Sequence, residues 1–123
     1  IFSLCIDPTN KMILSGSRDA HLKIWSLEDA KALHLVEDIV AHMYAINHIS
    51  YHSNGHYFVT CSMDKSIKIW DSGTFKLIRV IDKGRYAGHG TSVNKLLSMP
   101  NKNSLISCSD DRTISVWDIN FSK

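Results

Sequence analysis

The chain lacks long apolar runs, an excess of charge and a cysteine framework, and each absence removes a class of protein. Its uninterrupted apolar runs span only a few residues, so no transmembrane span is predicted, and no charged start before an apolar core marks a signal peptide. With 14 basic and 12 acidic residues the net charge is +2, so neither nucleic acid nor a membrane is expected as a partner. The 123 residues, 44% of them hydrophobic, suffice for one globular domain.

The three cysteines, Cys5, Cys61 and Cys108, form an odd set without framework spacing, which argues against a disulfide scaffold. Cys61 and Cys108 each lie nine residues before a tryptophan, so we expect equivalent positions in a repeat rather than a bonded pair. Free thiols in strands favour a cytoplasmic, reducing location. The first residue is Ile1 rather than Met, from which we expect the chain to be part of a longer protein.

All three tryptophans belong to one repeated pattern. They are separated by 45 and 47 residues, and each follows an aspartate by six residues and a serine or threonine by ten. A histidine stands 22 residues before the second and third of these aspartates. A period of this length predicts an array of repeated supersecondary units. The repeated residues are Ser15, Asp19 and Trp25; His42, Thr60, Asp64 and Trp70; and His89, Ser107, Asp111 and Trp117.

The local pattern within each unit is β throughout. In the second unit "AINHISYH", "YFVTCSM", "SIKIWD" and "FKLIRVI" are separated by turn signals such as "SNGH". "SLEDAKALHLVE" could pass for a helix, but the other units place a strand there, so a strand is expected. Four short antiparallel strands in a unit of about 45 residues predict a β-propeller blade.

The chain resembles the WD-repeat family over nearly its whole length. The resemblance is carried by "GSRDAHLKIW", "CSMDKSIKIWD" and "CSDDRTISVWD", with "AH" and "GH" upstream. It implies an all-β fold of propeller blades, each of four antiparallel strands, in an incomplete ring. We expect 1–123 to be a partial propeller, with one blade at 1–38 that lacks its start, a second at 39–85 and a third at 86–123.

Three departures from the family pattern leave the repeated residues untouched. Ser26 follows the first tryptophan where the family has Asp, and Ala41 precedes the second unit's histidine where the family usually has Gly. "KGRYA" lengthens the loop before Gly88. A complete propeller needs about four to eight blades. Because fewer are visible, we expect the remaining propeller blades or another copy of the chain to cover the open faces and edge strands.

The resemblance also implies a buried polar network in each blade. The turn aspartate accepts a hydrogen bond from the histidine, whose other nitrogen accepts from the Ser or Thr hydroxyl, which in turn accepts from the indole N–H. Every buried donor then has an acceptor. We expect two such structural tetrads, His42–Thr60–Asp64–Trp70 and His89–Ser107–Asp111–Trp117, and an incomplete set of Ser15, Asp19 and Trp25.

Recurring His, Ser and Asp residues also invite a hydrolase interpretation. A catalytic triad has no reason to repeat in register and no "GxSxG" string occurs, so we predict no catalytic residue and no enzyme activity. His48, His52 and His56 could suggest a metal site, but on a strand the first two lie about 13 Å apart, so no metal site is predicted. No "GxxxxGK" or "GxGxxG" loop occurs, and we predict no cofactor.

As a member of this family, the chain is expected to be a non-catalytic propeller segment that binds a protein or peptide through its top face. In the family, partner contacts favour positions three and five after the histidine and the residue before the turn aspartate. These positions are Phe2 and Arg18 in the first blade, Ala45, Asn47 and Met63 in the second, and Ser92, Asn94 and Asp110 in the third. The alternative is the scaffold part of a larger multidomain enzyme or signalling protein, and a purely structural role also stays open.

Overall fold

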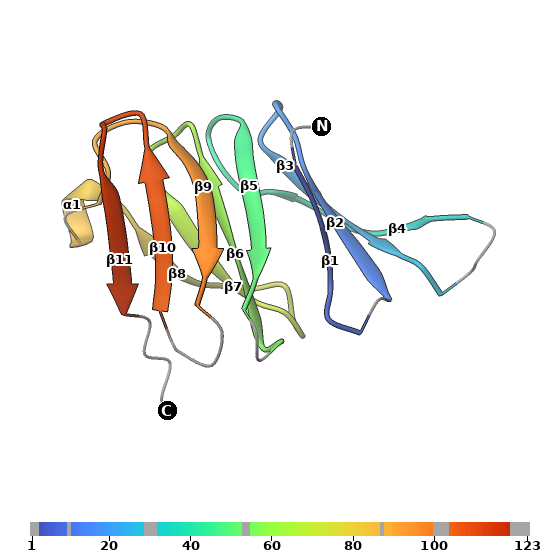
Figure 1. Cartoon of the computed structure of the whole chain (residues 1–123). Helices are drawn as coiled ribbons and strands as arrows, with labels where there is room; N and C mark the ends of the chain where they lie inside the picture. Colours follow the sequence, from blue (N-terminus) through green and yellow to red (C-terminus); the bar gives the residue numbers. More distant parts are fainter. Residues whose placement is uncertain are drawn as a thin grey trace.

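The computed structural model describes residues 3–9, 11–28, 32–52, 55–86, 88–99 and 104–118, which form three antiparallel sheets (Figure 1). The first sheet has the order β1 (Ser3–Ile6), β2 (Met12–Gly16), β3 (His21–Ser26) and β4 (His34–Val40). The second has β5 (Ile46–Tyr51), β6 (Tyr57–Ser62), β7 (Ile67–Asp71) and β8 (Leu77–Ile81). The third contains β9 (Val93–Ser98), β10 (Ser104–Ser109) and β11 (Ile114–Asp118). The all-β architecture with four-stranded sheets is confirmed, and the last four residues of the helix-like stretch "SLEDAKALHLVE" lie in the strand β4.

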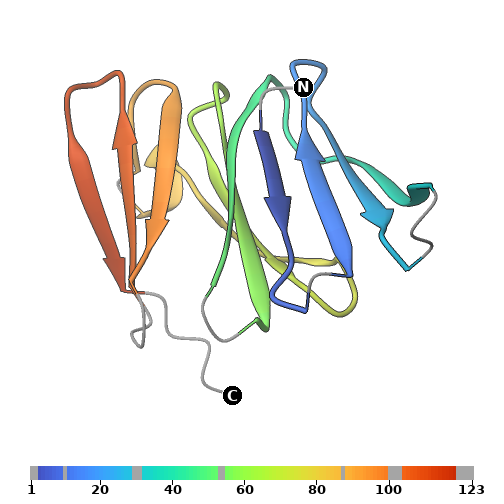
Figure 2. The ribbon, with the colours of Figure 1, turned by 45° about the vertical axis from the view of Figure 1, so that its right-hand side comes forward.

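The three sheets stand side by side in an open arc, and their first strands are neighbours (Figures 1 and 2). β5 contacts β1 on one side and β9 on the other. The Ile46 amide reaches across to the first sheet and donates to the Ser17 carbonyl at 3.0 Å. On the other side the Leu96 amide donates to His48 Nδ1 at 2.9 Å. The second sheet is therefore tied to both neighbours by hydrogen bonds as well as by packing.

The core consists of two apolar layers, one on each face of the second sheet. Successive side chains of a strand point to opposite faces, so β6 supplies both layers, and all six of its residues are buried. The layer against the first sheet contains Leu14, Leu22, Ile24, Ala41, Ile46, Ile49, Phe58 and Trp70. The layer against the third contains Tyr57, Val59, Cys61, Ile67, Ile69, Ile81, Val93, Leu96 and Leu105.

The two outer faces of the arc expose apolar side chains. Leu4 and Ile6 are exposed on β1, and Leu97, Ile114 and Val116 are exposed on the third sheet. On the inner faces the equivalent side chains form the two buried layers. The ring formed by the described residues is thus unclosed, as the sequence predicts.

The β2–β3, β6–β7 and β10–β11 turns share one conformation. Each places a residue other than glycine in the left-handed region: Ala20 (φ 71°), Lys65 (φ 76°) and Arg112 (φ 70°). In each turn this residue's amide donates to the carbonyl three residues earlier, as from Lys65 to Ser62 at 3.3 Å. The three turns lie at the same edge of the arc (Figure 1). We call this edge, together with the segments that lead into β5 and β9, the top rim.

One helical turn, α1 (Lys83–Tyr86), was not expected from the sequence. It occupies the lengthened loop between β8 and β9 (Figure 1). The Gly88 amide donates to the Asp82 carbonyl at 3.2 Å, and a Cβ on Gly88 would lie 2.8 Å from the Asp82 carbonyl carbon. The chain therefore returns tightly onto Asp82, and the extra residues coil into a helical turn.

Candidate functional site

The second unit contains a continuous hydrogen-bonded chain of four side chains. Trp70 Nε1 donates to Thr60 Oγ1 at 3.0 Å, and Thr60 Oγ1 lies 2.7 Å from His42 Nε2. His42 Nδ1 lies 2.8 Å from Asp64 Oδ2. β6 and β7 place the hydroxyl and the indole on the same face, because Thr60 pairs with Lys68 and Phe58 with Trp70. The loop before β5 brings the histidine over this hairpin.

The third unit repeats this geometry. Trp117 Nε1 donates to Ser107 Oγ at 2.8 Å, and Ser107 Oγ lies 2.8 Å from His89 Nε2. His89 Nδ1 is 3.0 Å from Asp111 Oδ2. Among the described residues of the first unit, one of these bonds is present, from Trp25 Nε1 to Ser15 Oγ at 3.1 Å. The first unit's turn aspartate, Asp19, accepts from the His21 amide at 3.0 Å, as Asp64 accepts from the Ser66 amide at 2.9 Å.

A further hydroxyl takes part in each complete network, and the sequence interpretation missed it. Ser66 Oγ donates to Asp64 Oδ1 at 2.5 Å and lies 3.2 Å from His42 Nδ1. Thr113 makes the corresponding bonds to Asp111 and His89 in the third unit. The signal was present, because both hydroxyls stand two residues after the turn aspartate and four before the tryptophan.

Electrostatics fixes the protonation state of the second network. Burial alone would raise the pKa of Asp64, but hydrogen bonds from His42, Ser66 and the Met43 amide hold it well below its ordinary value. Burial lowers the pKa of His42, in spite of the hydrogen bond to Asp64 that raises it. At neutral pH a neutral imidazole therefore donates from Nδ1 to an ionised carboxylate, and its Nε2 accepts from Thr60.

The Asp64–His42–Thr60 sequence has the order of a catalytic triad but not its accessibility. The Thr60 side chain is fully buried, and its hydroxyl is engaged by His42 and by the Trp70 indole. A nucleophile must reach a substrate, and this hydroxyl is sealed beneath the packed indole. What the arrangement can do chemically is satisfy buried polar groups and hold a turn against a strand.

Four of the side chains predicted to contact a partner are joined in a second hydrogen-bonded chain along the top rim. Asn47 Nδ2 crosses from β5 and donates to Ser92 Oγ at 3.0 Å and to the Val93 carbonyl at 2.8 Å. Ser92 Oγ donates to Asn94 Oδ1 at 3.1 Å, and Asn94 Nδ2 donates to Asp110 Oδ1 at 2.7 Å. The chain runs across two sheets and ends on an exposed carboxylate.

The other predicted contact residues differ in accessibility. Arg18 is exposed in the β2–β3 turn, and Met63 is exposed in the β6–β7 turn. Ala45 is buried, and its carbonyl accepts from the Met63 amide at 3.1 Å. Phe2 lies outside the described residues. The rim therefore offers side chains from three turns at one edge, with Ala45 acting below the surface through its backbone.

Two exposed side chains at the rim were missed by the sequence interpretation. Met43 and Tyr44 directly precede Ala45. Met43 is 80% exposed and Tyr44 is 61% exposed. The Met43 amide donates to Asp64 Oδ2 at 3.1 Å, and the Tyr44 carbonyl accepts from Ser62 Oγ at 3.2 Å. Their position directly after the repeat histidine was a usable signal, because the histidine side chain points inward and leaves the next residues at the surface.

The histidines of "HISYHSNGH" have separate surroundings. His48 accepts from the Leu96 amide, and burial lowers its pKa. His52 is buried against the Tyr57 ring, with centroids 4.8 Å apart, whereas His56 is exposed. Within the described ranges no three metal-ligating side chains come together in a cluster.

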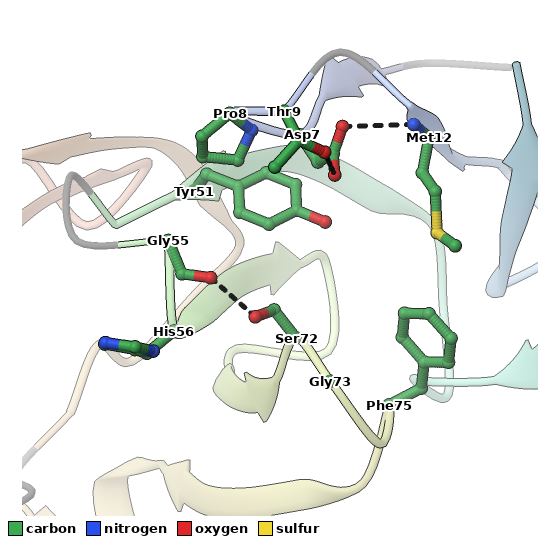
Figure 3. A pocket seen from close by; sticks show the side chains of 10 residues that line it. All are labelled: Asp7, Pro8, Thr9, Met12, Tyr51, Gly55, His56, Ser72, Gly73 and Phe75. Atoms are coloured by element: carbon green, nitrogen blue, oxygen red, sulfur yellow. Dashed lines mark hydrogen bonds between the residues drawn. The ribbon is translucent and has the colours of Figure 1, made fainter. Parts of the chain in front are cut away.

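A cavity of about 500 Å³ is lined by residues of the first two sheets (Figure 3). Its lining includes the β1–β2 turn, which lies at the edge of the arc opposite the top rim (Figure 1). The Asp7 carboxylate in its wall accepts from Thr9 Oγ1 at 2.7 Å and from the Met12 amide at 3.0 Å. Ser72 Oγ donates to the Gly55 carbonyl at 2.6 Å. These polar groups hold their own turns together. The lining residues are Asp7, Pro8, Thr9, Met12, Tyr51, Gly55, His56, Ser72, Gly73 and Phe75.

Over the part of the chain that the structure describes, no helix has the length and apolar character needed to cross a membrane. Cys5, Cys61 and Cys108 are free thiols. Burial raises the pKa of both Cys5 and Cys61, which keeps these thiols protonated.

The family model described as "WD domain, G-beta repeat" matches residues 1–26, 34–71 and 78–118. These three matches account for most of the chain. They include the three strings that carry the family resemblance, each of which ends at or just after a tryptophan.

Curated proteins resemble this chain in sequence. Nuclear distribution protein PAC1 of Debaryomyces hansenii is 33% identical over 109 residues, which cover 77% of this chain and 20% of that protein. Eukaryotic translation initiation factor 3 subunit I of Dictyostelium discoideum is 32% identical over 78 residues, covering 63% of this chain and 23% of that protein. The chain thus spans about a fifth of the length of these relatives.

Solved structures share the fold. The structure described as "Structure of U3-55K" has a TM-score of 0.86 and 23% sequence identity, and covers 97% of this chain and 36% of that chain. "Crystal structure of RRP9 WD40 repeats" has the same TM-score and identity, with 97% and 35% covered. At this identity the likeness concerns the fold alone.

Proposed function

The chain belongs to the WD-repeat family, and we propose that it is a non-catalytic propeller segment that holds a protein or peptide partner on its top rim. WD-repeat blades are a typical scaffold for protein interactions and are generally without catalysis. The observation that carries the proposal is the polar chain from Asn47 through Ser92 and Asn94 to Asp110. It connects two sheets along one edge and leaves a carboxylate at the surface.

Arg18, Met63 and Asp110 occupy equivalent positions in the three rim turns and are exposed. A basic, an apolar and an acidic side chain at equivalent positions cannot all serve one packing role. The turns instead depend on backbone bonds, such as that from the Asp110 amide to the Ser92 carbonyl at 3.2 Å. The rim side chains are thereby free to match a partner, and a rigid platform presents them at little entropic cost.

Arg18→Glu in the full-length protein tests this function. The substitution reverses a rim charge outside the core, so the free energy of unfolding should change by about 0.5 kcal/mol or less, while a partner's association slows or is lost. Proteins that co-purify with the wild type are quantified by mass spectrometry against the variant. Lys76→Glu, an equal charge change at an exposed residue between β7 and β8, is the control.

Loss of specific partners in Arg18→Glu but not in Lys76→Glu supports the top rim. The proposal fails if both variants retain every partner. It also fails if Arg18→Glu unfolds at clearly lower urea concentration, because Arg18 would then be a structural residue.

We propose further that the protein acts in the reducing cytoplasm, in line with its free thiols, and that its partners are proteins rather than nucleic acid or membrane. Further propeller blades or another copy of the chain would cover the exposed Leu4 and Ile6 at one end and Ile114 and Val116 at the other. Since the chain spans about a fifth of the relatives named above, a scaffold role within a larger multidomain enzyme or signalling protein is the second candidate.

A further inference from the structure

Three large apolar side chains are gathered on two hydrogen-bonded loops of the second unit. Met43, Tyr44 and Met63 are 80%, 61% and 52% exposed. Their loops are bonded to each other, because the Met43 amide donates to Asp64 and the Met63 amide donates to the Ala45 carbonyl. Scattered apolar side chains are ordinary on a surface, but three large ones on adjoining loops form a patch.

The third unit shows that the fold does not require this patch. Its equivalent residues are Gly90, Thr91 and Asp110. The Gly90 amide donates to Asp111 Oδ2 at 3.1 Å, the same length as the bond from Met43 to Asp64. The remaining loop bonds recur as well, at 3.2 Å from the Asp110 amide to the Ser92 carbonyl and at 3.4 Å from Ser109 Oγ to the Thr91 carbonyl. The same scaffold forms with small and polar side chains.

An acidic group lies on the next unit, at the end of the rim chain. The rim chain runs from Asn47, two residues after Ala45, through Ser92 and Asn94 to Asp110. Asn94 holds one carboxylate oxygen of Asp110, and across the described residues no cation pairs with it. Along the same rim, the second unit therefore presents exposed apolar side chains and the third unit an acidic side chain without a paired cation among the residues that the structure describes.

We propose that Met43, Tyr44, Met63 and Asp110, which we call the rim patch, bind a peptide segment that carries a bulky apolar side chain a few residues from a Lys or Arg. This inference rests on the proposed function and specifies its partner. Unbranched methionines adapt to the shape of an apolar side chain, and aromatic and Met residues are enriched in interface cores. The carboxylate of Asp110 selects a cation at the margin, where charges set orientation and association rate.

Selection of random twelve-residue peptides displayed on phage, with the full-length protein as bait, tests the proposal. We expect the enriched peptides to share a large apolar residue and a basic residue. Peptides from this selection are then synthesised and their affinities measured. In Tyr44→Thr/Met63→Asp, which installs the third unit's own residues, affinity should fall roughly tenfold or more.

Asp110→Asn is the second variant. Its amide oxygen can still accept from Asn94, so the rim geometry is retained while the charge is lost. Affinity for peptides with the basic residue should fall several-fold, whereas affinity for the same peptides with that residue changed to Gln should be unaffected. Ile78→Thr, which removes an exposed apolar side chain from β8, is the control and should bind as the wild type does.

The outcomes separate this inference from the proposed function. If selected peptides lose affinity in Arg18→Glu yet bind Tyr44→Thr/Met63→Asp as well as the wild type, the top rim binds peptides but the rim patch is wrong. Enriched peptides without a common apolar residue overturn the rim patch in the same way. If no peptide is enriched, or if those enriched are insensitive to every rim variant, both the rim patch and the proposed function are overturned.

Discussion

The second and third units make the same hydrogen bonds in different surroundings. The second sheet is covered on both faces, and Trp70 is buried against Phe58. The centroids of these two rings are 6.2 Å apart, and their planes are inclined by 9°. In the third sheet no described strand lies outside β11, and Trp117 is only partly buried. Each unit therefore forms its network from its own residues, while neighbouring sheets determine how far that network is desolvated.

The largest expected difference between the two units is at their tryptophans. Trp70→Ala should lower the free energy of unfolding by about 3–5 kcal/mol, because it empties a space between two sheets and leaves Thr60 without its indole donor. Trp117→Ala should cost less, since part of this indole already faces solvent. Urea denaturation of both variants, made in the 123-residue chain, measures the difference, because further propeller blades in the full-length protein would also cover the third sheet. Equal costs would contradict the view that burial by neighbouring sheets sets the contribution of each tryptophan.

Replacing the turn aspartate should also cost more stability in the second unit than in the third. Asp64→Ala removes the acceptor of His42 and of the Met43 amide, at a cost of about 1–3 kcal/mol. Asp111→Ala should be milder, because the Asp111 side chain is 20% exposed against 7% for Asp64, and water can replace the lost acceptor. Urea midpoints of the two variants decide the order. A milder effect at Asp64 than at Asp111 would contradict the view that burial sets the contribution of each turn aspartate.

The smallest expected effect is a pH dependence caused by His42. Its pKa in the folded protein lies below the ordinary 6.5 because of burial, so between these two values the unfolded chain binds more protons. Stability should be full above about pH 6.5 and fall as the pH drops below it. His42→Gln should reduce this slope in urea midpoints measured from pH 7.5 to 5. The residual slope includes His48, whose pKa burial also lowers. An unchanged slope would contradict the role given to His42.

The sequence was most informative where all partners belong to one unit. Thr60 and Trp70 are ten residues apart on one hairpin, and the resemblance to the WD-repeat family led us to expect their bond. Ser66 and Thr113 were missed, although their spacing is equally regular, because the family pattern drew attention to four residues. The helical turn at Lys83–Tyr86 was missed because it depends on a tight return onto Asp82 rather than on helix propensity.

The sequence by itself determined the repeat and the strand order within each unit, because alternation and turn signals fix each hairpin locally. Through the family resemblance it also indicated four residues of each complete polar network. Only the tertiary structure decided what lies between units. Asn47 bonds to Ser92, a residue 45 positions away, and no local pattern encodes that contact. Exposure is equally non-local: Ala45 is buried while the adjacent Tyr44 reaches solvent. Such positions depend on how the loop before β5 lies against the β6–β7 turn and the neighbouring sheets, which spacing within a unit does not specify.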